Sequence, residues 1–135
     1  MQDDVQRLHQ HLRAGQCCAE ALVRMGLELT GGENPQLLQA VRGLCGGVRD
    51  GMLCGALTGA ACMLSMVDPG QADELLVPEL SQWFRATMAA QYGGCDCADI
   101  VGPDPANKAV RCPPLVEATY LQAMKILRNN GHEIP

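Results

Sequence analysis

Four of the eight cysteines in this sequence stand where a helix is expected to begin. They are Cys18, Cys54, Cys97 and Cys112. The unpaired N–H groups and the positive dipole end of a helix N-terminus stabilise anions, so we expect lowered pKa values for these thiols. Thiolates bind soft metals and attack disulfides. If the four helix starts converge, their sulfurs form one site for metal or redox chemistry.

Glycines surround Cys54 in the segment GGVRDGMLCGALTGA. Because glycine has no Cβ, the backbone N–H groups of Gly47, Gly51 and Gly55 are expected to approach sulfur closely and to help bind a cofactor. Gly55 and Gly59 are four residues apart, which on a helix permits a close crossing with a neighbour. A role in packing alone is the alternative explanation for these glycines.

The other four cysteines have weaker assignments. Cys17 is turned about 100° around the helix from Cys18, toward the polar edge. Cys62 lies on an apolar helix and is expected in the core. Cys45, in the glycine-rich loop, is a spare ligand or a resolving thiol. Only one residue separates Cys95 from the predicted ligand Cys97, too few for the usual zinc-knuckle spacing, which leaves a strained dithiol or a replacement ligand.

Apolar residues recur at helical spacing along the chain, and no segment shows convincing strand alternation. The pattern predicts an all-α fold, a compact bundle of about five to six helices. The segment 53–67 is apolar on every face, which predicts a central helix. The expected helices are 5–14, 16–30, 34–44, 53–67, 76–92 and 112–130, with a short helical turn within 95–102.

Length and composition limit the classes of protein to consider. The 135 residues suffice for one domain, 1–135, with its own core. The net charge of −5 argues against a nucleic-acid-binding surface. The polar N-terminus has no secretory h-region, and the longest apolar run, 55–67, is too short to span a bilayer. We therefore expect a cytoplasmic protein, in which thiols serve metal or redox chemistry more often than structural disulfides.

Four segments of the sequence, QCCAEALV, GMLCGALTGA, CDCADIVG and RCPPLVEATYLQAMKIL, resemble the cysteine segments of the C-GCAxxG-C-C family of redox-active proteins. Their order and spacing match over nearly the whole chain, and CGALTGA is the most specific. The resemblance assigns the family's cysteines to the four selected above, the first being Cys18 rather than Cys17. Gly55, Ala56 and Gly59 complete the central motif. A similar domain occurs in split-Soret cytochromes, where an iron–sulfur site has been proposed.

Three functions follow from these observations. The first is an iron–sulfur protein for electron transfer or redox sensing, with all four thiolates as ligands. The second is an oxidoreductase working by thiol–disulfide exchange, with Cys54 as the attacking thiol and Cys18 or Cys112 as the resolving thiol. The third is a Cys₄ site for zinc or another soft metal. The partners that we expect are a redox partner protein and a second copy of the chain in a homodimer.

Overall fold

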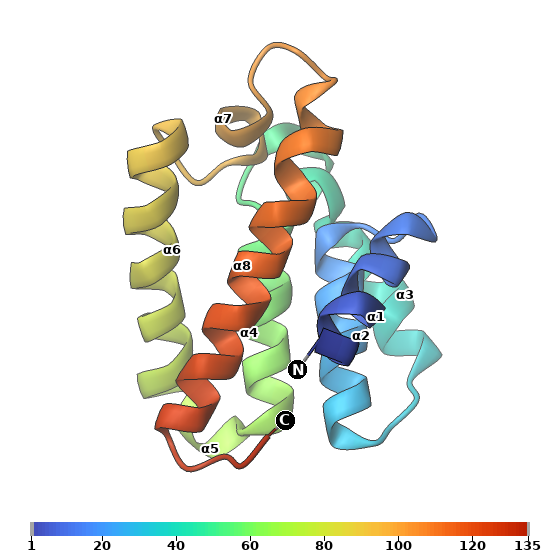
Figure 1. The fold of residues 1–135 in the computed structure, drawn as a ribbon, viewed down its shortest axis with the longest axis vertical. Coiled ribbons are helices and arrows are strands. Elements are labelled where there is room, and N and C mark those ends of the chain that lie inside the picture. Colours follow the sequence, from blue (N-terminus) through green and yellow to red (C-terminus); the bar gives the residue numbers. More distant parts are fainter. Residues whose placement is uncertain (1, 135) are drawn as a thin grey trace.

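The computed structural model describes residues 2–134, which form an all-α fold (Figure 1). Short helical turns between the longer helices raise the number of helical segments above the predicted five to six. The long helices are α1 (Gln2–Arg13), α2 (Cys18–Thr30), α4 (Gly55–Val67), α6 (Val77–Tyr92) and α8 (Asn107–Asn129). The short segments are α3 (Pro35–Val41), η1 (Arg42–Leu44), η2 (Gly47–Gly51), α5 (Pro69–Gln71), η3 (Ala72–Leu76) and α7 (Cys97–Val101).

The last helix begins earlier than the sequence predicted. Cys112 and the two prolines after it were expected to start this helix, but α8 begins at Asn107 and holds Pro113 and Pro114 in its interior. A proline inside a helix leaves the carbonyl four residues earlier without its N–H donor. Here those carbonyls belong to Ala109 and Val110, which are exposed to solvent. Water can therefore satisfy them, and the helix continues through both prolines.

Helices α2 and α4 cross very closely, as the spacing of two glycines predicted. A Cβ atom on Gly59 would lie 2.8 Å from Cα of Ala19, and one on Gly55 would lie 3.3 Å from the Ala19 nitrogen. The same Gly55 position is 3.5 Å from Cβ of Cys18. Because these two glycines have no side chains, the start of α2, with its cysteine, packs directly against the start of α4.

Helix α4 packs against α2, α6 and α8, and most of its apolar residues are buried among them. One side of α4 is less covered than its uniformly apolar sequence predicted. Cys62 and Met66 are half-buried and Ser65 is exposed, and this side lines a surface pocket together with Leu37 and Val77. Complete enclosure of this helix is therefore not confirmed, and Cys62 lies at the margin of the core rather than inside it.

The N-terminal helix is fastened to the C-terminal one by buried and half-buried polar contacts. The Tyr120 hydroxyl donates to Asp4 Oδ2 at 2.5 Å, and His9 Nε2 lies 2.6 Å from Glu117 Oε1. Burial raises the pKa of Tyr120, which keeps the hydroxyl protonated as a donor. Among the described residues, no helix combines the length and the apolar character that crossing a membrane requires.

We expect Gly59→Ala to destabilise the protein. The new methyl group would collide with the backbone of Ala19, and such overpacking typically costs about 1–3 kcal/mol. Alanine is also the better helix former by about 1 kcal/mol, so the net loss lies toward the lower end of that range. Urea denaturation followed by circular dichroism measures the free energy of unfolding.

Gly43→Ala is the matched control, because a Cβ on the exposed Gly43 would meet nothing within 4 Å. A Gly59→Ala variant as stable as the control would contradict the close crossing.

Candidate functional site

The four cysteines selected from the sequence come together in the structure from α2, α4, α7 and α8. They interact as two hydrogen-bonded pairs, which we call the α4–α7 pair (Cys54 and Cys97) and the α2–α8 pair (Cys18 and Cys112). The pairs are also close enough to influence each other's charge, Cys18 acting on Cys54 and Cys97 acting on Cys112. Figure 1 shows α7 near the beginnings of α4 and α8.

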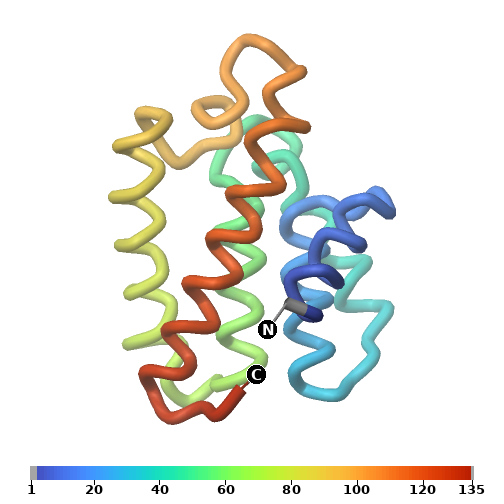
Figure 2. Tube along the Cα trace, viewed as in Figure 1, coloured from blue at the N-terminus to red at the C-terminus, as the bar shows by residue number. Residues whose placement is uncertain are grey.

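A short antiparallel contact positions the α4–α7 pair. The Cys54 N–H donates to the Cys95 carbonyl at 3.1 Å, and the Cys97 N–H donates to the Met52 carbonyl at 2.7 Å. An isolated β-bridge joins the residues between these bonds, so the segments before α4 and before α7 lie side by side (Figure 2). Sequence reasoning missed this contact because it is too short to show strand alternation. The structure thereby gives Cys95 a backbone role in the site.

The first N–H groups of α4 face the sulfurs of this pair. The Ala56 N–H donates to Cys54 Sγ at 3.4 Å, and the Gly55 N–H donates to the Cys97 sulfur. The Gly55 N–H thus helps to lower the pKa of Cys97, while its predicted part in binding a cofactor stays a prediction. The first N–H groups of a helix have no carbonyl partner within the helix. They can therefore donate to sulfur, and this stabilises negative charge on it.

Gly47 and Gly51 have contacts of a different kind. Both adopt positive φ angles, 65° and 67°, which glycine tolerates best. The Gly47 carbonyl accepts the Met52 N–H at 3.0 Å, and a Cβ on Gly51 would lie 3.4 Å from Cβ of Ala98. These two glycines shape the loop that leads into the β-bridge, and their predicted part in binding a cofactor stays a prediction.

Two of the four thiols have lowered pKa values. The hydrogen bond from Cys54 lowers the pKa of Cys97 to about 6, with further help from the Gly55 N–H and the charge of Lys108. The hydrogen bond from Cys18 lowers the pKa of Cys112 to about 7, again assisted by Lys108. Both shifts prevail over partial burial, which acts in the opposite direction. Each pair thus holds a thiolate near neutral pH.

The expectation of lowered pKa values is wrong for Cys54 and Cys18. The hydrogen bond to Cys97, and then burial, raises the pKa of Cys54, which is only 3% exposed. The bond to Cys112, and then burial, raises the pKa of Cys18. Each pair therefore keeps one proton near neutral pH, on Cys54 in the α4–α7 pair and on Cys18 in the α2–α8 pair.

Three of the four cysteines lie at the N-terminus of a helix, as predicted. Cys54 precedes the first residue of α4, while Cys18 and Cys97 are the first residues of α2 and α7. Cys112 lies inside α8, so its lowered pKa comes from Cys18 and from Lys108, one helical turn earlier. The predicted helix start at Cys112 was wrong, although this thiol does lie at the site.

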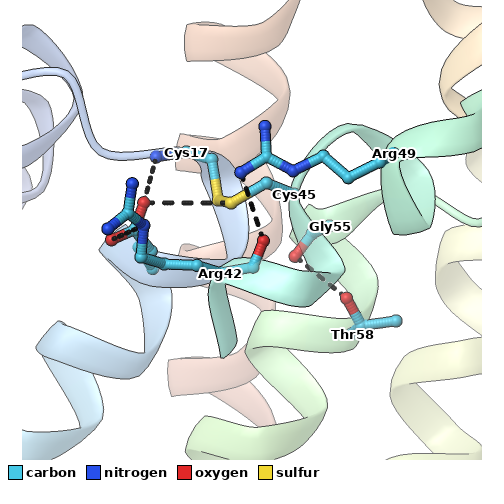
Figure 3. Close-up of a disulfide and its surroundings, with 7 residues drawn as sticks. Cys17, Arg42, Cys45, Arg49, Gly55 and Thr58 are labelled. Carbon is cyan, nitrogen blue, oxygen red and sulfur yellow. Dashed lines mark hydrogen bonds and ion pairs between the residues drawn. A yellow bond between two sulfur atoms is a disulfide. The ribbon is translucent and has the colours of Figure 1, made fainter. Parts of the chain in front are cut away.

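Cys17 and Cys45 form a disulfide that the sequence did not reveal (Figure 3). Their Cα atoms are 5.7 Å apart, and 28 positions separate them in the sequence. The bond joins the residue before α2 to the loop that precedes α4. The expectation that disulfides are the weaker explanation is wrong for this pair, because the close α2–α4 crossing brings this loop over the start of α2. Sequence spacing alone carries no signal for such a pairing.

The protein-family model described as "Putative redox-active protein (C_GCAxxG_C_C)" matches residues 16–126 of the chain. This range contains all eight cysteines. No curated protein and no solved structure matches the chain.

We expect the rate at which Cys97 is alkylated to rise with pH around its lowered pKa, because the thiolate is the reactive form. At pH 7 a thiol of pKa about 6 is roughly nine-tenths ionised, against a few per cent for an ordinary cysteine. Since the Cys54 thiol stabilises the Cys97 thiolate, Cys54→Ala should raise the pKa of Cys97 and slow its alkylation at pH 7 by about fivefold or more. Iodoacetamide labelling at a series of pH values, read by peptide mass spectrometry, gives the titration curve.

Cys62→Ala is the control and should leave the Cys97 curve unchanged, because Cys62 takes no part in the pair. An unchanged curve in Cys54→Ala would show that another group holds the charge.

Proposed function

Because this chain belongs to the C-GCAxxG-C-C family of redox-active proteins, we propose that its two thiol pairs hold an iron–sulfur cluster. The ligands are those of the α4–α7 pair and the α2–α8 pair. Such a cluster, when bound, supplies one-electron transfer, so the protein acts in electron transfer or redox sensing. Its counterpart is a redox partner protein.

The arrangement of the sulfurs in pairs is the observation that carries this proposal. A [2Fe–2S] cluster with four cysteine ligands takes two thiolates on each iron. Around a single tetrahedral ion with bonds of about 2.3 Å, all four sulfurs would instead lie about 3.8 Å from one another. Among residues 2–134, no three of these four sulfurs are mutually within 4.8 Å. Two pairs therefore fit two metal ions better than one.

The surroundings of the sulfurs suit negatively charged ligands. Two of the four thiols already ionise near neutral pH, and Cys54 and Cys18 would each give up a proton on binding. The N–H groups at the start of α4 and the positive charge of Lys108 stabilise the negative charge of the thiolate ligands. Burial of Cys54 keeps water from one side of the site, while half-buried Cys97 and Cys112 face the surface from which a partner would approach.

Thiol–disulfide exchange is a second candidate function, favoured by the pairing of a thiolate with a thiol. The Cys97 thiolate would attack a substrate disulfide, forming a mixed disulfide and releasing one substrate thiolate. Cys54, after losing its proton, would attack the Cys97 sulfur and release the second substrate thiolate. The substrate is reduced as the α4–α7 pair is oxidised. Because its raised pKa keeps Cys54 protonated, Cys97 replaces it as the attacking thiol.

We also propose a reducing compartment, the cytoplasm, as the location of the protein. Six cysteines are free thiols, and thiols of this number persist where glutathione and thioredoxin keep them reduced. A homodimer and a Cys₄ zinc site stay predictions from the sequence.

Purification without oxygen tests the cluster. We expect an absorption band at about 400 nm, and iron and sulfide in equal amounts, about two of each per chain for a [2Fe–2S] centre. Cys54→Ser should abolish both the colour and the iron, because it removes one ligand from a buried pair. Absorption, iron, sulfide and zinc are measured on the same sample.

Cys62→Ser serves as the control, and it should retain the full iron and sulfide content. A colourless protein with stoichiometric zinc would contradict the cluster and favour the zinc site. A colourless protein without metal, but with titratable thiols, would favour disulfide exchange. Equal loss in both variants would refute the assignment of the ligands.

A further inference from the structure

We infer that Cys17, Glu20 and Cys45 form a second metal site, closed while the two cysteines are joined as a disulfide and opened when they are reduced. The site takes a zinc-like divalent ion. It is separate from the two thiol pairs and shares no ligand with them, although Cys17 and Cys18 are adjacent in the chain.

The three donor groups already converge. Both sulfurs and a carboxylate oxygen of Glu20 lie within 4.8 Å of one another, the only such set of three or more metal-binding groups in residues 2–134. Glu20 Oε1 is 3.8 Å from Cys45 Sγ. Two thiolates on a tetrahedral zinc ion lie about 3.8 Å apart. The Glu20 oxygen already stands at about ligand spacing from the Cys45 sulfur.

Groups other than the two sulfur atoms hold the carboxylate in place. Oε1 of Glu20 accepts the Cys17 backbone N–H at 3.3 Å, and its other oxygen lies 3.9 Å from Arg42 Nε. The Glu20 side chain is only 15% exposed. Neither contact is made by a sulfur atom, so reduction of the disulfide breaks neither of them directly.

The charges around the site favour a cation in the reduced state. Once both thiols have lost their protons to a bound ion, two thiolates and a carboxylate carry three negative charges in a half-buried position, which Arg42 and the N-terminus of α2 balance only in part. Arg49 reaches the same loop by donating to the Arg42 carbonyl at 3.4 Å (Figure 3). A divalent cation neutralises most of the negative charge that remains.

The donor set points to the class of metal. Two sulfurs and one carboxylate suit zinc or cadmium, whereas magnesium and calcium require oxygen ligands. Three protein ligands leave a fourth position for water, as in zinc sites that stay open to a further ligand. The site would hold an ion only when the compartment is reducing, and release it on oxidation.

A dithiol or a phosphine supplies the electrons that reduce the Cys17–Cys45 bond. A dithiol gives two electrons and two protons to the Cys17–Cys45 bond, producing two thiols while it becomes a disulfide itself. Binding of Zn²⁺ then displaces the two thiol protons and leaves two zinc–sulfur bonds. Exchange with a disulfide oxidant takes two electrons from the thiolates, re-forms the Cys17–Cys45 bond, leaves the oxidant as two thiols that take their protons from water, and frees the ion.

Zinc titration of the full-length apoprotein tests this inference. The disulfide form should carry six free thiols and the phosphine-reduced form eight, counted with a thiol reagent. We expect the reduced form to bind one more equivalent of Zn²⁺ than the disulfide form, measured by competition with a chromogenic chelator. Because the inference rests on this difference, it holds or fails independently of what the two thiol pairs bind.

Variants identify the ligands. Reduced Cys45→Ser should lose the additional equivalent, and reduced Glu20→Gln, which can still form the disulfide, should bind it about tenfold or more weakly. Cys62→Ser is the matched control and should keep it. No additional zinc on reduction, or full retention in both Cys45→Ser and Glu20→Gln, would overturn the inference. Circular dichroism verifies that each variant is folded.

Discussion

The close crossing of α2 and α4 is the constraint on which the rest of the structure depends. Gly59 leaves no room for a Cβ between its backbone and Ala19, and a Cβ on Gly55 would lie tightly, 3.3 Å, against the Ala19 nitrogen. An ordinary side chain at either glycine would separate the two helix starts. With them separated, Cys18 would no longer lie near Cys54, and the loop before α4 would no longer cover the start of α2. The thiol pairs and the disulfide thus share one packing requirement.

The α4–α7 pair combines a buried sulfur with one nearer the surface, and this asymmetry governs its chemistry. Burial keeps the proton on Cys54, and the hydrogen bond from that thiol stabilises the Cys97 thiolate. The Gly55 N–H at the start of α4 adds to the effect. Charge is therefore held where a metal or a partner can reach it, while the neutral thiol fills the interior. A helix N-terminus alone would have ionised the buried member as well.

The disulfide and the thiol pairs lie next to each other, near the N-terminal ends of α2 and α4. The bond between Cys17 and Cys45 is made by the residue before α2 and the loop before α4, and Cys18 begins the thiol site one residue later. The groups around the disulfide, Glu20 and Arg42, differ from those around the thiol pairs, where Lys108 is the nearby cation. The two sites can therefore respond to different ions, although one packing arrangement positions both.

The sequence by itself determined the helical class, the close crossing at Gly55 and Gly59, and the position of Cys18, Cys54 and Cys97 near helix starts, because periodicity and local spacing carry that information. It misplaced the start of α8, since exposed carbonyls let two prolines continue a helix. The direction of each pKa shift and the Cys17–Cys45 bond were decided only by the tertiary structure. Both depend on which sulfur lies beside which and how deeply, and those distances are set by helix packing between residues far apart in the chain.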